Sequence, residues 1–323
     1  MTQFKASVII PTKNPGAVFK AVLNSVLSQS TPWPFEIVVI DSGSTDGTLE
    51  FVRSKPPVKL IEILPSDFGH GKSRNYAIEQ SSGEFVAVIT HDAQPVKDNW
   101  LKSLVETAEQ DERIAGVFGR HVAYDHASIF TKRELELHFS GFRDAPLVFL
   151  EDSARYEADL GYKQFLHFFS DNNALLRRSV WEKIPYPDVD FAEDQSWAKS
   201  IIEAGFLKAY SEEAVVYHSH DYGLFERFQR SFDESYAFKR FFGYILSPGL
   251  KPMVESFMAL SRRDISYSRS IGLLRRKPFV VAFAVLDNFM RVFGHYLGAR
   301  GERIPSYVRS KISRDKKLFA QSQ

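Results

Sequence analysis

Residues 84–95 carry an uninterrupted apolar run that leads directly into a single carboxylate, Asp92. The run, Phe-Val-Ala-Val-Ile, lacks apolar–polar alternation, which is typical of a strand covered on both faces of a parallel sheet. Ligands of such sheets bind beyond the carboxyl ends of the strands, where Asp92 would lie. The segment predicts a buried strand ending at a divalent-cation ligand, and a solvated turn aspartate is an equal alternative for this segment alone.

The same arrangement recurs along the first 120 residues. We expect strands at 5–10, 35–40, 58–64, within 84–95 and at 114–120, and helices at 17–29, 48–54, 73–80 and 100–111. Strands alternating with helices at this spacing predict βαβ units and a Rossmann-like, mostly parallel sheet flanked by helices. Residues 121–165 lack clear periodicity and are expected to form an insertion that lines one side of a site.

The net charge of +1 conceals two oppositely charged regions. Residues 239–323 hold 17 Lys and Arg against 5 Asp and Glu, whereas residues 1–238 have a balance of −11. Basic and aromatic residues interleave in the last part, which fits a surface resting on anionic lipid headgroups. A helical subdomain with solvated Lys and Arg is an equal alternative. Nucleic-acid binding is disfavoured, because the front region is acidic and no recognition motif is present.

The chain shows no sign of disulfides, secretion or membrane insertion. Cysteine is absent, which excludes thiolate metal sites and fits a cytoplasmic location. Residues 1–7 do not resemble a signal peptide, and the longest apolar run, 278–286, is about half of a membrane span. We therefore expect no segment to cross a bilayer, and we divide the chain into residues 1–225 and a basic, mainly helical region, 226–323.

Polar loops follow four of the expected strands and should meet at one edge of the sheet. These loops are Pro11–Asn14, Asp41–Gly47, Ser66–Asn75 and Thr90–Pro95. Together they define a crevice that suits a nucleotide. Gly71-Lys72-Ser73 is not the end of a P-loop, because Ser66 stands where that motif needs a glycine. No Gly-x-Gly-x-x-Gly follows the first strand, which argues against a dinucleotide dehydrogenase.

The first and third loops offer specific contacts to a nucleotide. Asp41 is placed to accept the imide N–H of a uracil or thymine, with Pro11 and Thr12 walling the base. Arg74 opens a helix whose N-terminal amides and positive charge favour a diphosphate, with help from Lys72. A helix-capping role for Asp41 and a plain surface position for Arg74 remain alternatives.

The second half of the chain supplies an acidic pair and two histidines. Glu193-Asp194 begins an amphipathic helix and offers a base that could activate an acceptor hydroxyl, although acidic residues also decorate helix starts. His218 and His220 follow an expected strand with i, i+2 spacing, point to one face and could supply an imidazole to a cation. Structural or surface histidines are an equal alternative.

Taken together, these motifs resemble the inverting family 2 glycosyltransferases, which have the GT-A nucleotide-sugar fold. The resemblance covers roughly residues 5–222 and rests on Ser7-Val-Ile-Ile-Pro-Thr-Lys-Asn14, Glu36-Ile-Val-Val-Ile-Asp-Ser-Gly-Ser-Thr-Asp-Gly47, Gly71-Lys-Ser-Arg-Asn75, Thr90-His-Asp-Ala-Gln-Pro95 and Ala192-Glu-Asp194. Within the family, residues 68–74, the Thr-His-Asp-Ala loop and residues 171–185 are most similar to bacterial rhamnosyltransferases that use dTDP-L-rhamnose.

The resemblance implies roles for individual residues. The implied donor-binding residues are Pro11, Thr12, Lys13, Asp41, Lys72, Arg74, His91 and Asp92. Asp194 would be the general base, and Asp92 would bind Mg²⁺ or Mn²⁺ with His218 or His220 as further ligands. The sequence departs from the family at Thr90, which replaces the first Asp of the Asp-x-Asp motif, so Asp92 is the only acid of that loop left for the cation.

The implied activity is the inverting transfer of L-rhamnose from dTDP-L-rhamnose to a saccharide acceptor during bacterial cell-surface polysaccharide synthesis. Residues 121–165 would lie on the acceptor side. The acceptor would be lipid-linked at the inner face of the cytoplasmic membrane, which residues 239–323 would contact peripherally. One alternative is a UDP-hexose donor, in a glucosyl- or galactosyltransferase. A nucleotidyltransferase is disfavoured by the loop 11–16, and a nucleotide-sugar-binding non-enzyme by the presence of Asp194.

Overall fold

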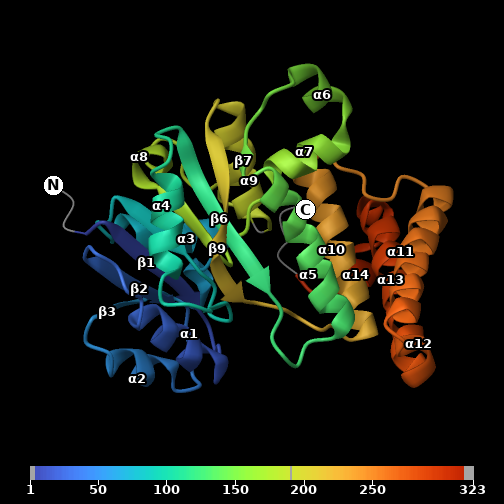
Figure 1. The fold of residues 1–323 in the computed structure, drawn as a ribbon, viewed down its shortest axis with the longest axis horizontal. Coiled ribbons are helices and arrows are strands. Elements are labelled where there is room, and N and C mark those ends of the chain that lie inside the picture. The colour runs from blue at the N-terminus through green and yellow to red at the C-terminus, as the bar shows by residue number, and fades with distance from the viewer. Residues whose placement is uncertain (1–3, 190, 316–323) are drawn as a thin grey trace. The chain divides into compact units, whose positions relative to one another are not determined.

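The chain forms two compact units in the computed structural model, which describes residues 4–189 and 191–315 (Figure 1). One unit extends to Ser219 and the other begins at His220. The division falls a few residues before the boundary that we placed at 225/226. The end of the predicted basic region, residues 316–323, lies outside the described residues.

The first unit is built on one mixed sheet. Its strands are β1 (Ala6–Thr12), β2 (Phe35–Asp41), β3 (Val58–Glu62), β4 (Phe85–Val88), β5 (Gln94–Pro95), β6 (Ile114–Val122), β7 (Leu147–Val148), β8 (Ala174–Arg177) and β9 (Leu207–Tyr217). The strand order is β3-β2-β1-β4-β8-β6-β9-β5, with β7 beside β9. Strands β1 to β4 are parallel, as expected, but β8 enters antiparallel between β4 and β6. The sheet therefore has a parallel half and a mixed half.

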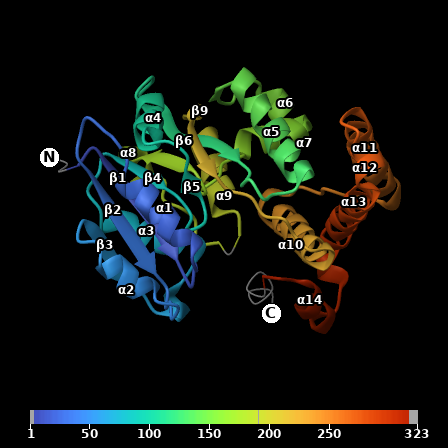
Figure 2. The ribbon, with the colours of Figure 1, turned by 60° about the horizontal axis from the view of Figure 1, so that its bottom comes forward.

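Helices cover both faces of this sheet. They are α1 (Val18–Leu27), α2 (Thr48–Arg53), α3 (His70–Glu79), α4 (Trp100–Ala108), α5 (Ile129–Asp144), α6 (Ser153–Ala158), α7 (Leu160–His167), α8 (Arg178–Trp181) and α9 (Glu193–Glu203), with a 3₁₀ turn at Pro65–Asp67. Strands β1–β3 gather with α1–α3 at the N-terminal end of the unit (Figure 2). Successive β1 residues enter opposite cores: Val8 packs in the core that holds Phe19 of α1, and Ile9 in the core that holds Ile78 of α3. Burial on both faces explains the unbroken apolar runs.

Residues 121–165 are more regular than the sequence suggests. They contain the end of β6, the helices α5, α6 and most of α7, and β7. The longest helix within residues 121–165, α5, buries only Phe139 and Phe142. Its apolar periodicity is therefore too sparse to see in the sequence. Its start is fixed by Ser128, whose hydroxyl accepts a hydrogen bond from the Thr131 backbone N–H at 3.1 Å.

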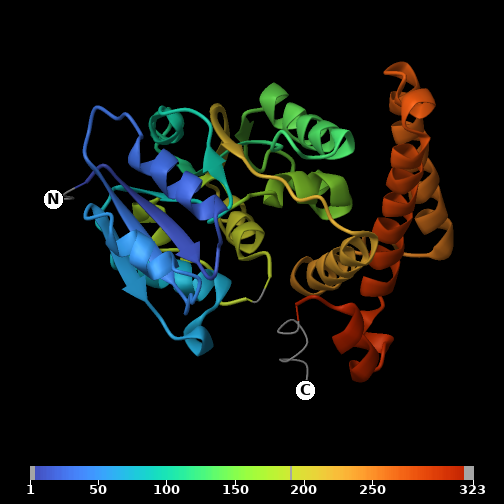
Figure 3. The same ribbon diagram turned by 90° about the horizontal axis from the view of Figure 1, so that it is seen from below.

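The second unit is helical, as predicted. Its helices are α10 (Leu224–Phe242), α11 (Leu250–Ser270), α12 (Leu273–Arg276), α13 (Pro278–Gly298) and α14 (Ser306–Ile312), with a 3₁₀ turn at Gly301–Arg303. Helix α13 lies alongside α11 (Figure 3) and also packs against α10. Two glycines permit the close approach to α10: a Cβ on Gly294 would lie 2.6 Å from the Phe228 carbonyl oxygen, and one on Gly298 would lie 2.3 Å from that of Phe232.

Helix α13 is long and apolar enough to cross a membrane by length and composition alone, and 28% of its most apolar window is buried. Its packed side carries polar contacts: the Asp287 carboxylate lies 2.9 Å from Arg227 Nε of α10, and Asn288 donates to Asp264 of α11. Its opposite side exposes a stripe of large apolar side chains at i, i+4, i+7 and i+10. The stripe consists of Phe279, Phe283, Leu286 and Phe289, and Phe279 is 87% exposed.

Candidate active site

Strands β1 and β2 end side by side and bring together two residues predicted to bind the base. Thr12 pairs in register with Asp41, and its hydroxyl donates to the Asp41 carboxylate at 3.0 Å. The same carboxylate accepts from the backbone N–H groups of Gly43 and Ser44 and from the Ser44 hydroxyl. A carboxylate has about four acceptor positions, so these four donors fill Asp41.

Binding of a base by Asp41 therefore remains a prediction. The side chain is 1% exposed, and an imide N–H would require a donor such as the Ser44 hydroxyl to turn away. Pro11, beside Thr12 at the end of β1, is partly exposed, and Lys13 is exposed just beyond it. The strand ends thus leave Pro11 and Lys13 accessible at the place where the sequence predicted a nucleotide.

The loop after β4 holds Asp92 next to the end of β9. The Asp92 carboxylate lies 3.8 Å from His218 Nε2. Asp92, His218 and His220 form a group of three possible ligands, and one ligand atom from each lies within 4.8 Å of the other two. The sequence-predicted residues are thus near neighbours, and a carboxylate with imidazoles is a donor set that suits Mn²⁺ better than Mg²⁺.

Two residues that the sequence analysis did not single out support this loop. The Tyr124 hydroxyl donates to the Asp92 carbonyl oxygen at 2.9 Å, and burial with the neighbouring Asp92 charge raises the pKa of Tyr124 to about 12. The His121 ring lies 5.4 Å from that of His218, and burial holds the pKa of His121 well below its usual value. His121 lies near the end of β6 and Tyr124 just beyond it, both far from Asp92 in the sequence, so no local motif could reveal them.

The Asp92–His218 pair gives a direct test of cation binding. We expect Asp92→Asn and His218→Ala each to weaken Mn²⁺ binding, measured by electron paramagnetic resonance of the full chain, on the order of 10-fold or more, because each removes a ligand atom. The matched variant Asp98→Asn removes an exposed carboxylate from the same polypeptide stretch and should leave Mn²⁺ binding unchanged. Equal Mn²⁺ affinity in all three variants would show that the cation does not bind at Asp92 and His218.

A second group of charged residues lies where α3 meets the start of α9. Arg74 Nη1 donates to Glu193 Oε1 at 2.6 Å, and Arg74 Nε lies 3.1 Å from Asp171 Oδ2, an ion pair whose N–H is not aimed at the carboxylate. The Tyr186 hydroxyl donates to the other oxygen of Asp171 at 2.6 Å. Arg74, Asp171 and Glu193 are 5%, 2% and 6% exposed. The predicted role of Arg74 in diphosphate binding stays a prediction, because the guanidinium is already held by two carboxylates.

Asp194 is the accessible carboxylate of this group. It is partly exposed, unlike Glu193 beside it, and it accepts hydrogen bonds from the backbone N–H groups of Gln195 at 2.7 Å and Asp171 at 3.3 Å. Desolvation of its carboxylate by burial, followed by the charges of Glu193 and Asp171, raises the pKa of Asp194 well above its usual value. A carboxyl group with a raised pKa that substrate can reach is suited to general-base work.

The chain enters α9 through an unusual backbone conformation. Ala192 is left-handed, with φ 55° and ψ 40°, directly before Glu193 and Asp194. Such angles are uncommon for residues other than glycine and are found preferentially at functional sites, where the surrounding structure enforces them. Ala192 therefore fixes the direction in which the first turn of α9 presents its two carboxylates.

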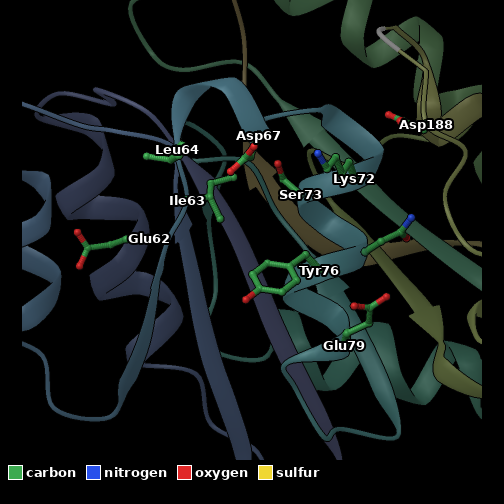
Figure 4. Close-up of a pocket in the computed structure, with 10 residues that line it drawn as sticks. Glu62, Ile63, Leu64, Asp67, Lys72, Ser73, Tyr76, Glu79 and Asp188 are labelled. Carbon is green, nitrogen blue, oxygen red and sulfur yellow. The ribbon is translucent and has the colours of Figure 1, made fainter.

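Lys72 lies on the outer side of α3, at a hollow of about 760 Å³ (Figure 4). Asp67, Tyr76 and Asp188 also line this hollow. Behind it, the start of α3 is pressed against the loop that leads to α9, since a Cβ on Gly71 would lie 2.2 Å from the Pro187 carbonyl oxygen. The structure thus places Lys72 on the solvent side of α3, whereas Arg74 is buried.

The comparisons with known proteins agree with this architecture. The family model of glycosyl transferase family 2 matches residues 7–184. The chain is 32% identical over 306 residues to the O-antigen chain rhamnosyltransferase RfbN of Salmonella typhimurium, covering 93% of this chain and 91% of that protein. It is 30% identical over 308 residues to the O-antigen chain rhamnosyltransferase WbaN of Salmonella anatum, covering 93% and 90%.

Solved structures share the fold at lower identity. The mannosyltransferase PcManGT of Pyrobaculum calidifontis, solved in complex with GDP-Man and Mn²⁺, superposes with a TM-score of 0.59 at 18% identity, covering 91% of this chain and 87% of that chain. TarS of S. aureus superposes with a TM-score of 0.51 at 21% identity, covering 91% of each chain.

The curled mixed sheet with helices on both faces, and the strand-end loops that carry the polar residues, define the GT-A fold. The chain belongs to glycosyl transferase family 2. It is an inverting glycosyltransferase, as the motifs implied, so the nucleotidyltransferase and the non-enzymatic alternatives are set aside.

Proposed function

We propose that this enzyme transfers L-rhamnose from dTDP-L-rhamnose, with inversion, to a saccharide acceptor in the synthesis of a bacterial cell-surface polysaccharide. The O-antigen rhamnosyltransferases described above support the donor sugar and the acceptor class, because both match 93% of the chain. The observation that carries the proposal is that two adjacent residues, Asp171 and Asn172, link the proposed base to the loop of the proposed cation ligand. The Asp171 backbone N–H donates to Asp194, and the Asn172 amide oxygen accepts from Thr90 at the start of the Asp92 loop.

In this proposal Asp194 takes the proton of the acceptor hydroxyl. The hydroxyl oxygen then forms a bond to the anomeric carbon of the donor sugar, from the side opposite the diphosphate, while the bond to the diphosphate oxygen breaks. The bonding electrons leave with the nucleoside diphosphate, and the configuration inverts. A divalent cation held by Asp92, His218 and His220 would supply Lewis-acid stabilisation of the leaving group. Because Thr90 holds the place of a second acid, the loop would offer the cation one carboxylate.

Thermal unfolding of the full chain tests the donor. We expect dTDP-L-rhamnose with Mn²⁺ to raise the unfolding midpoint more than UDP-glucose or UDP-galactose does, since a ligand at 100 times its Kd stabilises the native state by about 2.7 kcal/mol. Free dTDP serves as the control for the contribution of the base and diphosphate. A larger rise of the unfolding midpoint with a UDP-hexose would contradict the dTDP-L-rhamnose proposal and favour a UDP-hexose as the donor.

We also propose that the second unit rests on an anionic membrane surface, which would bring the enzyme to a lipid-linked acceptor at the inner face of the cytoplasmic membrane. The apolar stripe on α13 is exposed at Phe279, Phe283 and Leu286, while Phe289 at its end also contacts Phe257 of α11. Three exposed basic residues, Arg275, Arg276 and Lys277, directly precede the helix. Apolar side chains beside basic ones are the pattern of interfacial helices. The charge of the triad is complementary to anionic headgroups, which favours a lipid surface over a second copy of this basic unit.

A further inference from the structure

Arg74, a cationic side chain whose charge acts on the proposed base, is already paired with other carboxylates. Arg74 is paired with Glu193 and Asp171, and Asp194 accepts two backbone N–H groups with no ion pair of its own among the described contacts. Asp171 contacts the base and its charged surroundings at once, through its backbone N–H on Asp194 and its side chain on Arg74 and Tyr186. Asp171 is 2% exposed, so it does not itself reach substrate.

We propose that Asp171 is a positioning residue for Asp194, which holds the base in place and keeps the Arg74 charge engaged so that Asp194 remains free to accept a proton. This proposal rests on the general-base role of Asp194 proposed above. It extends that role by assigning a task to a buried residue that contacts Asp194 but does not itself reach substrate.

The groups that face Asp194 come from four segments. They are Arg74 from α3, Asp171 from the turn before β8, Tyr186 from the loop after α8, and Glu193 from α9, with His70 of α3 at 4.0 Å from Glu193. Glu193 and Asp171 raise the pKa of Asp194 beyond the effect of burial, and Arg74 opposes them weakly. Removing the charge of Asp171 takes away one repulsive carboxylate and leaves more of the Arg74 charge acting on Asp194. Both changes favour the ionised form, so the pKa of Asp194 should fall.

The test is the pH profile of kcat/KM, whose acid limb reports the pKa of the essential base in the free enzyme. We expect Asp171→Asn to move the acid limb to lower pH and to reduce the plateau less than about 10-fold, because a weaker base remains in place. Tyr186→Phe removes the hydrogen bond that favours ionised Asp171, so it should move the limb in the same direction by a smaller amount. This second variant also keeps the proposal testable if Asp171→Asn does not fold.

Glu182→Gln is the matched control, since it removes an exposed carboxylate from the segment between α8 and α9. Its acid limb should coincide with that of the unmodified enzyme. A purely structural role would lower the unfolding midpoint of Asp171→Asn and Tyr186→Phe while leaving the limb in place, and this result would overturn the proposal. Asp194→Asn separates the two levels: if it keeps full activity, the general-base assignment fails, whereas an inactive Asp194→Asn with unmoved limbs in the other variants removes only the positioning role.

Discussion

Replacing Asp194 with Asn is expected to lower kcat by 10²–10⁴-fold, the usual contribution of a positioned general base. Asparagine keeps the size of the side chain but has one acceptor oxygen, whereas Asp194 accepts from the backbone N–H groups of Gln195 and Asp171 through different oxygens. One of these two hydrogen bonds is therefore kept, and the loss with the largest effect on the rate is the ability to take up a proton. The measurement is the rate of sugar transfer with saturating donor.

Nucleotide binding distinguishes this outcome from general damage. Asp194 makes no contact with the strand ends at Thr12 and Asp41 among the described hydrogen bonds, so Asp194→Asn should bind dTDP with unchanged Kd by calorimetry. Glu182→Gln, which likewise replaces a carboxylate by an amide in the segment before α9, should keep its transfer rate. Turnover by Asp194→Asn equal to that of the control would exclude Asp194 as the base.

Neutralising Arg275, Arg276 and Lys277 together as glutamines is expected to weaken binding to anionic vesicles on the order of 100-fold. Each basic residue at such a surface contributes about 1 kcal/mol, so three contribute about 3 kcal/mol. Phe279→Ser should weaken binding further, since Phe279 is 87% exposed and its insertion into the acyl boundary would be lost. Co-sedimentation with vesicles containing phosphatidylglycerol measures both effects, and the loss should shrink as salt rises.

The matched control neutralises three exposed lysines of the first unit, Lys20, Lys97 and Lys183, and changes the net charge by the same amount. It should leave vesicle binding almost unchanged. Equal losses in the two triple variants would mean that binding follows net charge rather than the α13 surface. If Phe279→Ser instead dissociates a dimer and vesicles never bind, the stripe is an interface between copies of the chain.

The sequence was most informative where local patterns determine structure. Parallel strands buried on both faces produce unbroken apolar runs, so the strands around Val8, Val38 and Val86 were predictable from residue type alone. Helix α5 was not, because only two of its side chains are buried. The antiparallel entry of β8 was also missed, since nothing local in residues 174–177 records which strand lies beside them.

The candidate site divides in the same way. Asp92, His218 and Asp194 follow strands or begin a helix, and motif positions marked them. The charged group around Asp194 could not be predicted, because Arg74 contacts Asp171 and Glu193 across about a hundred residues of chain. The sequence predicts that Arg74 faces a ligand, and this stays a prediction. Its burial against two carboxylates is a tertiary property that no spacing rule contains.

The left-handed Ala192 has a consequence for which residues this position can accept. An L-residue in that conformation costs about 1–2 kcal/mol relative to right-handed backbone, a cost that glycine avoids. Glycine, however, adds freedom to the unfolded chain that is worth roughly 0.5–1 kcal/mol. The first term is about twice the second, so folding stability alone favours glycine at residue 192 by less than the full cost of the left-handed backbone. What alanine adds is a narrower range of backbone angles immediately before Glu193 and Asp194, which would hold the proposed base in one orientation.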